Sequence, residues 1–259
     1  MDVKNKRVVI TGAANGIGRA MALAFHSAGA KSILVSDINE NDAKTVSEKI
    51  KGSFIKTDVT KETDIFNLLS KANEEFGGID IFCSNVGVGD YEDFLKTTRD
   101  DWYRILNINL MSHIYITRKV LPNMLKQGSG YIVFTASAAG LLSLIGSASY
   151  SVTKHAVVSL AEWIKIMYGK FGIGVSCSCP MYVRTAMTEG MPNVPHNMIE
   201  PEVVAEEVLK AIEQEQFLVT PHPEVLDYLK YKVSDYDGWI SDMQDLQENF
   251  MSELDTLSK

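Results

Sequence analysis

The chain has 259 residues, of which 46% are hydrophobic and 22% charged, the composition of an ordinary soluble globular protein. Length alone does not require two domains, so a single domain over residues 1–259 is expected. The formal net charge of -8 opposes non-specific binding to nucleic acid or to anionic membranes. The sequence has neither an apolar run of bilayer-spanning length nor a signal-peptide pattern at its start, so we expect a cytoplasmic protein without a membrane partner.

Short β-branched segments alternate with longer amphipathic segments along most of the chain. The expected strands are residues 8–11, 33–36, 54–57, 79–84, 131–136, 175–179 and 217–220. The expected helices are residues 16–28, 41–50, 61–76, 100–126 and 150–168. This alternation predicts an α/β fold, a Rossmann-like doubly wound parallel sheet with helices on both faces.

Two later segments interrupt the alternation. Residues 181–200 contain two prolines and four of the eleven methionines, and they lead into a helix expected from near Pro201. We interpret this stretch as a mobile apolar lid over a substrate. From residue 223 to 256 we expect a C-terminal helical extension, because apolar side chains recur there at the spacing of one helix face. That face needs a partner surface.

A glycine-rich turn follows the first strand and opens the first helix, with the sequence Thr-Gly-Ala-Ala-Asn-Gly-Ile-Gly at residues 11–18. Gly12 permits the tight turn, Gly16 lets the backbone approach a pyrophosphate, and Gly18 allows close helix packing. Aligned N–H groups at a helix N-terminus attract phosphate. A plain structural turn is the alternative, and the strand-to-helix position favours dinucleotide binding.

The second strand ends at Asp37, where a carboxylate can accept hydrogen bonds from the adenosine ribose hydroxyls and repel a 2′-phosphate. Asn15 occupies a turn position where a basic side chain would reach that phosphate. NAD(H) is therefore favoured over NADP(H). Asp37 also fits a helix N-terminal signal, a role compatible with ribose binding. Asp58 and Val59 end the third strand, where they either border the adenine or, for Asp58, cap the next helix.

Tyr150 and Lys154 are four residues apart, so on a helix they share one face. A lysine beside a tyrosine lowers the phenol pKa, which would let the tyrosine exchange protons with an alcohol. Two other tyrosine–lysine pairs have this spacing, Tyr115 with Lys119 and Tyr228 with Lys232. Only Tyr150 follows a strand that ends in a serine-containing loop, so we interpret the other two pairs as solvated helix faces.

These motifs, together with Ser84 to Gly87, Asn109, Ser137 and Pro180 to Thr185, resemble the short-chain dehydrogenase/reductase family in its compact form. The resemblance runs from Lys6 to about Thr220. It implies a sheet of about seven parallel strands, a bound nicotinamide dinucleotide, and reversible oxidation of an alcohol to a carbonyl compound. It also implies a homo-oligomer, commonly a tetramer, built from the helices of residues 100–126 and 150–168.

Carried over by this resemblance, Tyr150 is the general acid/base, Ser137 orients the substrate oxygen, and Lys154 lowers the tyrosine pKa and binds the nicotinamide ribose. Asn109 matches an asparagine that holds a water in a proton relay, with a helix-kinking or capping role as the alternative. The residues expected to contact the cofactor are Gly12, Asn15, Gly16, Ile17, Gly18, Asp37, Ile38, Asp58, Val59, Asn85, Gly87, Tyr150, Lys154, Pro180, Val183 and Thr185.

Valine at 86 and methionine at 181 stand where the family commonly has alanine and glycine, which alters the shape of the pocket. An apolar substrate pocket is expected from Leu144, Met181, Met187 and Met191. The sequence thus predicts an NAD(H)-dependent enzyme that interconverts a lipophilic secondary alcohol and its ketone. A reductase of a carrier-linked 3-oxoacyl chain and a non-catalytic dinucleotide-binding scaffold are the alternatives. The three cysteines lack zinc-type spacing, so we expect buried reduced thiols and no metal.

Overall fold

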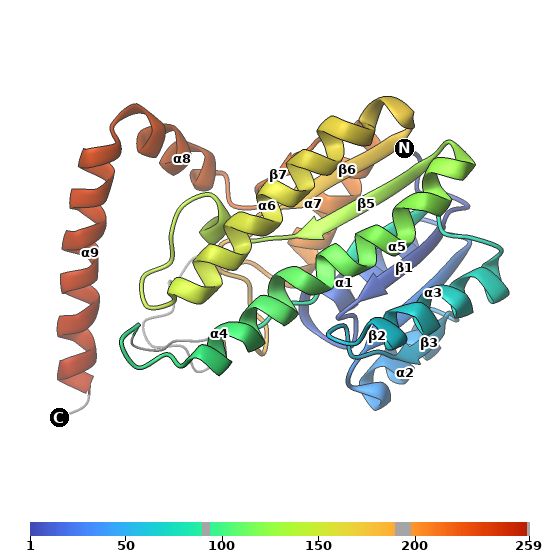
Figure 1. Cartoon of the computed structure of the whole chain (residues 1–259), viewed down its shortest axis with the longest axis horizontal. Helices are drawn as coiled ribbons and strands as arrows, with labels where there is room; N and C mark the ends of the chain where they lie inside the picture. Colours follow the sequence, from blue (N-terminus) through green and yellow to red (C-terminus); the bar gives the residue numbers. More distant parts are fainter. Residues whose placement is uncertain (90–93, 190–197, 258–259) are drawn as a thin grey trace.

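A computed structural model of the chain describes residues 1–89, 94–189 and 198–257. Its centre is a seven-stranded parallel sheet in the order β3-β2-β1-β4-β5-β6-β7 (Figure 1). The strands are β1 (Arg7–Thr11), β2 (Ser32–Asp37), β3 (Ser53–Lys56), β4 (Ile81–Ser84), β5 (Gly130–Thr135), β6 (Ile173–Ser178) and β7 (Leu218–Val219). The predicted fold class is confirmed. The order reverses between β1 and β4, the point in such sheets where ligands bind.

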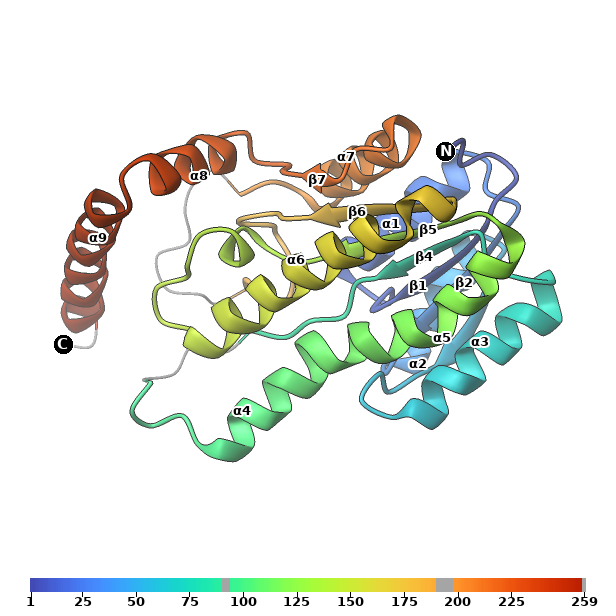
Figure 2. The same cartoon turned by 45° about the horizontal axis from the view of Figure 1, so that its top comes forward.

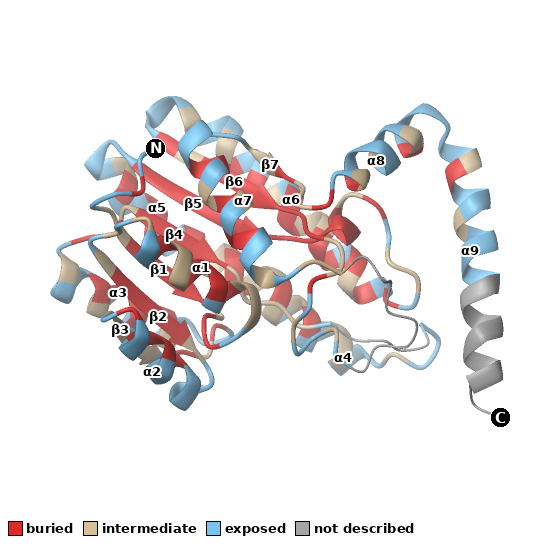
Figure 3. Cartoon of the chain, turned by 180° about the vertical axis from the view of Figure 1, so that it is seen from behind, coloured by how far each residue is buried: buried red, intermediate tan, exposed pale blue. Residues whose placement is uncertain are grey.

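Helices cover both faces of the sheet, and β1 shows why. Val9 packs into a core cluster with residues of α3 (Glu62–Phe76), α5 (Ser112–Gln127) and α6 (Ala148–Tyr168). Val8 and Ile10 point the other way, into a cluster with α1 (Gly16–Ser27), α2 (Glu40–Lys49) and α7 (Pro201–Gln214). Side chains alternate across a strand, so a central parallel strand must be apolar on both faces. The buried sheet between the two layers is visible in Figure 3.

The long helix expected over residues 100–126 is interrupted. It consists of α4 (Arg99–Leu106), a π-helical segment (Asn107–Met111) and α5. Within the π-segment the Asn109 side chain turns inward and is fully buried. Segments of this kind concentrate at functional sites because they reposition a side chain that a regular helix would aim elsewhere.

The C-terminal extension is two helices, α8 (Glu224–Ser234) and α9 (Tyr236–Leu257), so the prediction of one continuous apolar face was wrong. The break lies at Asp235, whose side chain accepts a hydrogen bond of 3.0 Å from the Gly238 amide. Val225 and Trp239 are buried in a cluster with Ala138 and Leu142, whereas Val233 is 74% exposed. Figures 1 and 2 show α9 projecting away from the body of the protein.

Among the described helices, none is long and apolar enough to cross a membrane. All three cysteines are buried and free, as expected. Over the described part of the chain, no three histidine, cysteine or acidic side chains lie close enough together to hold a metal ion.

Candidate functional site

The glycine turn is built around close backbone contacts at the start of α1. Gly12 and Gly16 have positive φ angles of 64° and 51°, which only glycine adopts without strain. A Cβ on Gly18 would overlap the carbonyl oxygen of Gly12. That same carbonyl accepts a hydrogen bond of 3.2 Å from the Asn85 side chain, which joins the turn to the end of β4. Gly18 therefore allows the close backbone packing of the turn, but it does not line the cavity described next.

A cavity of about 460 Å³ runs along the carboxyl ends of the strands, from Asp37 at one end to Tyr150 at the other. With the exception of Gly18, every residue expected to contact the cofactor lines this cavity. The sequence reasoning missed further lining residues. They are Thr57, Thr60, Val88, Ile108, Thr135, Ala136 and Thr188.

The Asp37 carboxylate spans the glycine turn and the start of the next loop. Its Oδ2 accepts a hydrogen bond of 3.0 Å from the Ala14 amide and its Oδ1 one of 3.0 Å from the Asn39 amide. Each carboxylate oxygen has lone pairs left for a further donor. Asp58 also lines the cavity, but it does not cap α3, whose N-cap is Lys61. A hydrogen bond from the Thr60 side chain lowers the pKa of Asp58.

At the other end of the cavity, Ser137, Tyr150 and Lys154 lie together. Lys154 is buried, and its Nζ donates a hydrogen bond of 3.0 Å to the Thr135 carbonyl at the end of β5. The same Nζ is 5.5 Å from the centre of the Tyr150 ring. A Cβ on Gly87 would be 2.9 Å from Lys154 Nζ, so the glycine leaves room for the ammonium group. The prediction that Tyr150 and Lys154 lie on the same face of one helix is confirmed.

Burial has the largest effect on the pKa of both Tyr150 and Lys154. Burial raises the pKa of Tyr150, and a hydrogen bond with Ser137 opposes that shift only in part. Burial also lowers the pKa of Lys154 to about 8. Both shifts have one cause, because a site with little water disfavours the charged form of each group. Spacing along a helix reveals the partner of a side chain but does not reveal how dry the site is.

The Asn109 side chain is occupied by the loop after β4. Its Oδ1 accepts a hydrogen bond of 2.8 Å from the Val88 amide, and its Nδ2 donates one of 2.8 Å to the Val88 carbonyl. Both structural and relay roles were open from the sequence. The contacts make Asn109 a positioning residue for the loop that carries Gly87.

Behind Lys154, α5 contributes a buried histidine that the sequence reasoning missed. The Nδ1 atom of His113 is 2.6 Å from the Ser84 hydroxyl at the end of β4. Burial and the nearby Lys154 lower the pKa of His113 to about 3. The imidazole is therefore neutral at physiological pH and adds no charge to the site.

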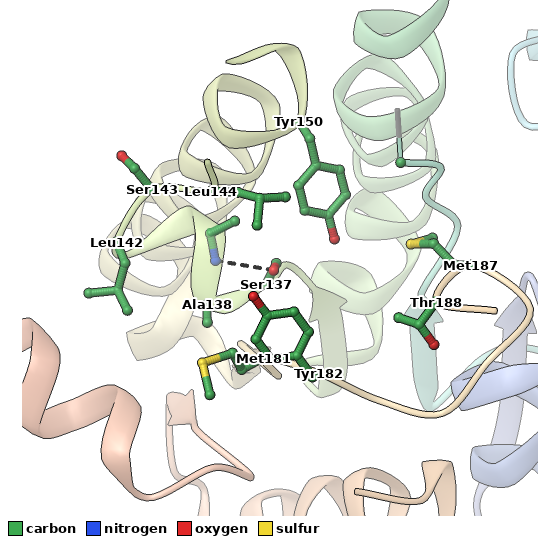
Figure 4. Close-up of a pocket in the computed structure, with 12 residues that line it drawn as sticks. Ser137, Ala138, Leu142, Ser143, Leu144, Tyr150, Met181, Tyr182, Met187 and Thr188 are labelled. Carbon is green, nitrogen blue, oxygen red and sulfur yellow. Dashed lines mark hydrogen bonds between the residues drawn. The ribbon is translucent and has the colours of Figure 1, made fainter. Parts of the chain in front are cut away.

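A smaller pocket of about 120 Å³ opens beside the end of the cavity that Ser137 and Tyr150 line (Figure 4). Leu144, Met181 and Met187 line it, as expected. Met191 lies outside the described residues. The two cavities share Ser137, Tyr150, Met181, Met187 and Thr188. A molecule in the small pocket would therefore meet a ligand in the large one at the hydroxyls of Ser137 and Tyr150.

The first half of the expected lid is tied to its end by β-type contacts. Val183 forms a parallel bridge with Ile199, and Arg184 is 2.7 Å from Glu200 in an ion pair. Residues 190–197 between them lie outside the described part of the chain. A closing motion of this segment stays a prediction.

One of the two tyrosine–lysine pairs taken as solvated is not. Lys232 of α8 is only 8% exposed, and its Nζ donates hydrogen bonds to carbonyls of the loop between Ser137 and Tyr150. That interpretation was wrong because the tail folds back over the loop, a long-range contact without a local sequence signal. Lys119, in the other pair, forms a partly exposed ion pair with Glu62.

The residues of the large cavity fit a nicotinamide dinucleotide. The N-terminus of α1 offers N–H groups for a pyrophosphate. A Cβ on Gly16 would be 3.1 Å from the methyl group of Thr185, so the absence of a side chain at Gly16 leaves space beside these N–H groups. Asp37 offers acceptors for ribose hydroxyls at one end. Tyr150 and Lys154 offer donors at the other end.

The family model described as short chain dehydrogenase matches residues 6–194. The chain belongs to this family, and it is an oxidoreductase. It is 32% identical over 213 residues to an uncharacterised oxidoreductase of Staphylococcus aureus, covering 81% of this chain and 92% of that one. It is 35% identical over 194 residues to the meso-2,3-butanediol dehydrogenase of Serratia marcescens, covering 74% and 77%.

The fold is also similar to that of a short-chain dehydrogenase/reductase from Burkholderia phymatum, solved in complex with NAD. The TM-score is 0.85 at 27% sequence identity, and the match covers 92% of this chain and 96% of that one. The family therefore binds nicotinamide dinucleotides through the fold described above.

Proposed function

We propose that this protein is an NAD(H)-dependent dehydrogenase that interconverts a lipophilic secondary alcohol and its ketone. One observation carries the proposal: the Ser137 and Tyr150 hydroxyls line both the large cavity and the small one. A substrate oxygen bound there would meet an acid/base group on the side that faces a cofactor. This is the arrangement that alcohol oxidation requires, because a proton and a hydride must leave adjacent atoms.

When bound, the nicotinamide accepts a hydride from the alcohol carbon or returns one to the ketone. Tyr150 takes the hydroxyl proton during oxidation and gives it back during reduction. Ser137 hydrogen-bonds the same oxygen and stabilises the charge that develops on it. Lys154, close to the phenol ring and fixed by the Thr135 carbonyl, favours the phenolate electrostatically whenever it is protonated.

The preference for NAD(H) over NADP(H) is proposed from Asp37. Its carboxylate faces the cavity between the glycine turn and Ile38, where a 2′-phosphate would meet its negative charge. Asn15, also on the cavity wall, provides no positive charge to offset it. The neighbouring structure from Burkholderia phymatum, solved with NAD, supports the same choice.

A lipophilic substrate is proposed from the walls of the small pocket, where Leu142, Leu144, Met181 and Met187 contribute apolar surface. Thioether side chains adapt to varied shapes. The relative from Serratia marcescens is named for a secondary alcohol substrate, which supports this reaction class. No charged side chain lines the described part of this pocket, which gives a phosphorylated carrier arm nothing to pair with there.

The test is an oxidation screen across secondary alcohols of graded size and polarity with NAD, repeated with NADP. We expect turnover of apolar secondary alcohols with NAD. Tyr150→Phe should lower kcat at least about 10²-fold while NADH binding is retained. Turnover confined to small polar or phosphorylated alcohols would contradict the lipophilic substrate. NADH binding without turnover of any alcohol or ketone would favour a scaffold role instead.

We also propose a cytoplasmic homo-oligomer, more readily a tetramer than a dimer, assembled through the helices of residues 99–127 and 148–168. The outer side of α6 supports this proposal, because Trp163, Ile166 and Met167 are 51%, 76% and 47% exposed. Large exposed apolar patches mark association surfaces. Sedimentation of the wild type and of Ile166→Glu, which should dissociate the assembly, tests the interface.

A further inference from the structure

The substrate pocket contains a hydroxyl group that the proposed chemistry does not use. Tyr182, two residues after Pro180, lines the small pocket together with Ser137 and Tyr150. Figure 4 shows the Tyr182 hydroxyl pointing toward Ser137, so that three hydroxyls converge on one region of the pocket. Within the described residues, the Tyr182 hydroxyl forms no hydrogen bond, whereas the Tyr182 backbone carbonyl has hydrogen-bond partners.

The backbone at Tyr182 is fixed from two sides. Its carbonyl oxygen is 3.1 Å from the Nε2 atom of His222 and accepts a hydrogen bond of 3.1 Å from the Ile199 amide. The Met181 amide donates one of 3.2 Å to His222 Nδ1. A neutral imidazole with its proton on Nε2 satisfies both contacts of His222, and burial favours that neutral form by lowering the pKa of His222.

The loop is also tied to the catalytic serine, because the Ala138 amide donates a hydrogen bond of 2.8 Å to the Pro180 carbonyl. The position of Tyr182 relative to Ser137 is therefore set by several backbone contacts. Preorganised donors of this kind bind a ligand group without an ordering cost. Leu142 and Leu144 share the wall with two further hydroxyl residues, Ser143 and Thr188. The Thr188 hydroxyl donates a hydrogen bond of 2.7 Å to the Val183 carbonyl, and the Ser143 hydroxyl points away from the other hydroxyls in Figure 4.

Burial raises the pKa of Tyr182, so the side chain stays an uncharged phenol near neutral pH. A neutral phenol both donates and accepts a hydrogen bond, and it suits a hydroxyl or a carbonyl oxygen better than a carboxylate. The reacting oxygen already has Ser137 and Tyr150 as partners. The Tyr182 hydroxyl is therefore available to a second oxygen close to the first.

We propose that Tyr182 is a specificity residue that hydrogen-bonds a second, uncharged oxygen on the carbon next to the reacting carbon. The preferred substrates are then vicinal diols, α-hydroxy ketones or α-diketones with an otherwise apolar skeleton. The inference rests on the proposed alcohol dehydrogenase function and narrows its substrate class. If the tyrosine ring only formed part of the pocket wall, the enzyme would not prefer substrates that carry the second oxygen.

The experiment compares racemic trans-cyclohexane-1,2-diol with cyclohexanol, which differ by one hydroxyl, in the wild type and in Tyr182→Phe. We expect the wild type to have the higher kcat/KM for the diol. Tyr182→Phe should lower kcat/KM for the diol about tenfold and change that for cyclohexanol less than about twofold. The loss is confined to one substrate because the ring and its packing are retained.

Ser143→Ala is the matched control, since Ser143 lines the same pocket but its hydroxyl points away from the other three in Figure 4. It should leave the ratio of the two kcat/KM values unchanged. An equal effect of Tyr182→Phe on both alcohols, or no effect on either, would overturn the inference. Unaltered thermal unfolding and NADH affinity would show that the phenylalanine variant is folded.

If neither alcohol is oxidised, the proposed function fails separately from the inference. Calorimetric binding of the two alcohols to the enzyme in the presence of NAD then decides on Tyr182. Weaker binding of the diol alone to Tyr182→Phe would support the second-oxygen contact. Equal affinities in the wild type and the variant would refute it.

Discussion

The Nζ atom of Lys232 lies 2.8 Å from the carbonyl oxygen of Leu141 and 3.2 Å from that of Leu142. A cation from the C-terminal tail thus holds the loop that runs from Ser137 toward Tyr150. Trp239 of α9 packs into the same small cluster, together with Leu142 and Met181. The tail is therefore part of the wall that shapes the substrate pocket.

Lys232→Met should lower the free energy of unfolding by about 1–3 kcal/mol, because two buried carbonyls lose a charged donor. KM for the alcohol should rise more than KM for NAD, since the loop borders the substrate pocket. Lys230→Met is the control, because Lys230 is exposed and forms an ion pair with Asp227 of its own helix. If the two variants changed the free energy of unfolding and the KM values equally, the stabilising role of the Lys232 hydrogen bonds to Leu141 and Leu142 would be contradicted.

Asp37→Asn should lower kcat/KM for NAD at least about tenfold and raise the ratio of NADP to NAD efficiency. The neutral side chain keeps one acceptor for the turn but no longer repels a 2′-phosphate. Asp42→Asn, at an exposed position in the first turn of α2, removes an equal charge outside the cavity. An unchanged cofactor ratio in Asp37→Asn would refute the role of this carboxylate.

Gly87→Ala should lower kcat at least about tenfold with little change in unfolding temperature. The new methyl group would be 2.9 Å from Lys154 Nζ and would displace the ammonium group, and catalytic geometry tolerates small shifts poorly. At Gly89, two residues on, a Cβ would be 3.7 Å from Met187, an ordinary contact. Steady-state kinetics of both variants make the comparison, and equal kcat values would exclude the crowding.

Acid should destabilise the protein through His113. Its folded pKa of about 3 lies below the usual 6.5, so the unfolded chain binds a proton more readily. The histidine therefore contributes its full share to stability above pH 6.5 and loses it as the pH falls toward 3. At pH 5 the loss is about 2 kcal/mol.

Urea denaturation between pH 7 and pH 4 measures this loss. His113→Gln should show a shallower fall of unfolding free energy with decreasing pH than the wild type. His26→Gln, at an exposed position in α1, provides the control for a missing histidine. A wild-type slope in His113→Gln would mean that other groups cause the acid sensitivity.

The sequence predicted the sheet, the glycine turn and the grouping of Ser137, Tyr150 and Lys154, because these features follow from local rules. Strand alternation, a turn that tolerates only glycine, and a four-residue helix spacing are all legible over short stretches. The residues that form the wall of the small pocket were harder to predict from the sequence. Tyr182 lay between two recognised motif positions, and no spacing rule indicates that its hydroxyl points toward Ser137.

Long-range contacts account for the features that the sequence did not predict. The inward turn of Asn109 depends on Val88, 21 residues earlier, and the burial of Lys232 depends on a loop some 90 residues away. The effect of burial on the pKa of Tyr150 likewise depends on the assembled site. The periodicity of a sequence cannot predict these contacts, because the residues that form each contact lie on different helices, strands or loops.

The contacts of the tail have a consequence for how this enzyme can change over time. The glycine turn, Ser137, Tyr150 and Lys154 all precede residue 155, whereas His222, Lys232 and Trp239 shape the pocket from beyond residue 220. Substitutions in the tail can therefore alter which molecule is accepted without touching the groups that move the proton. The tail is thus an additional stretch of the gene, separate from the one that encodes Ser137, Tyr150 and Lys154, in which substitutions can adjust the pocket.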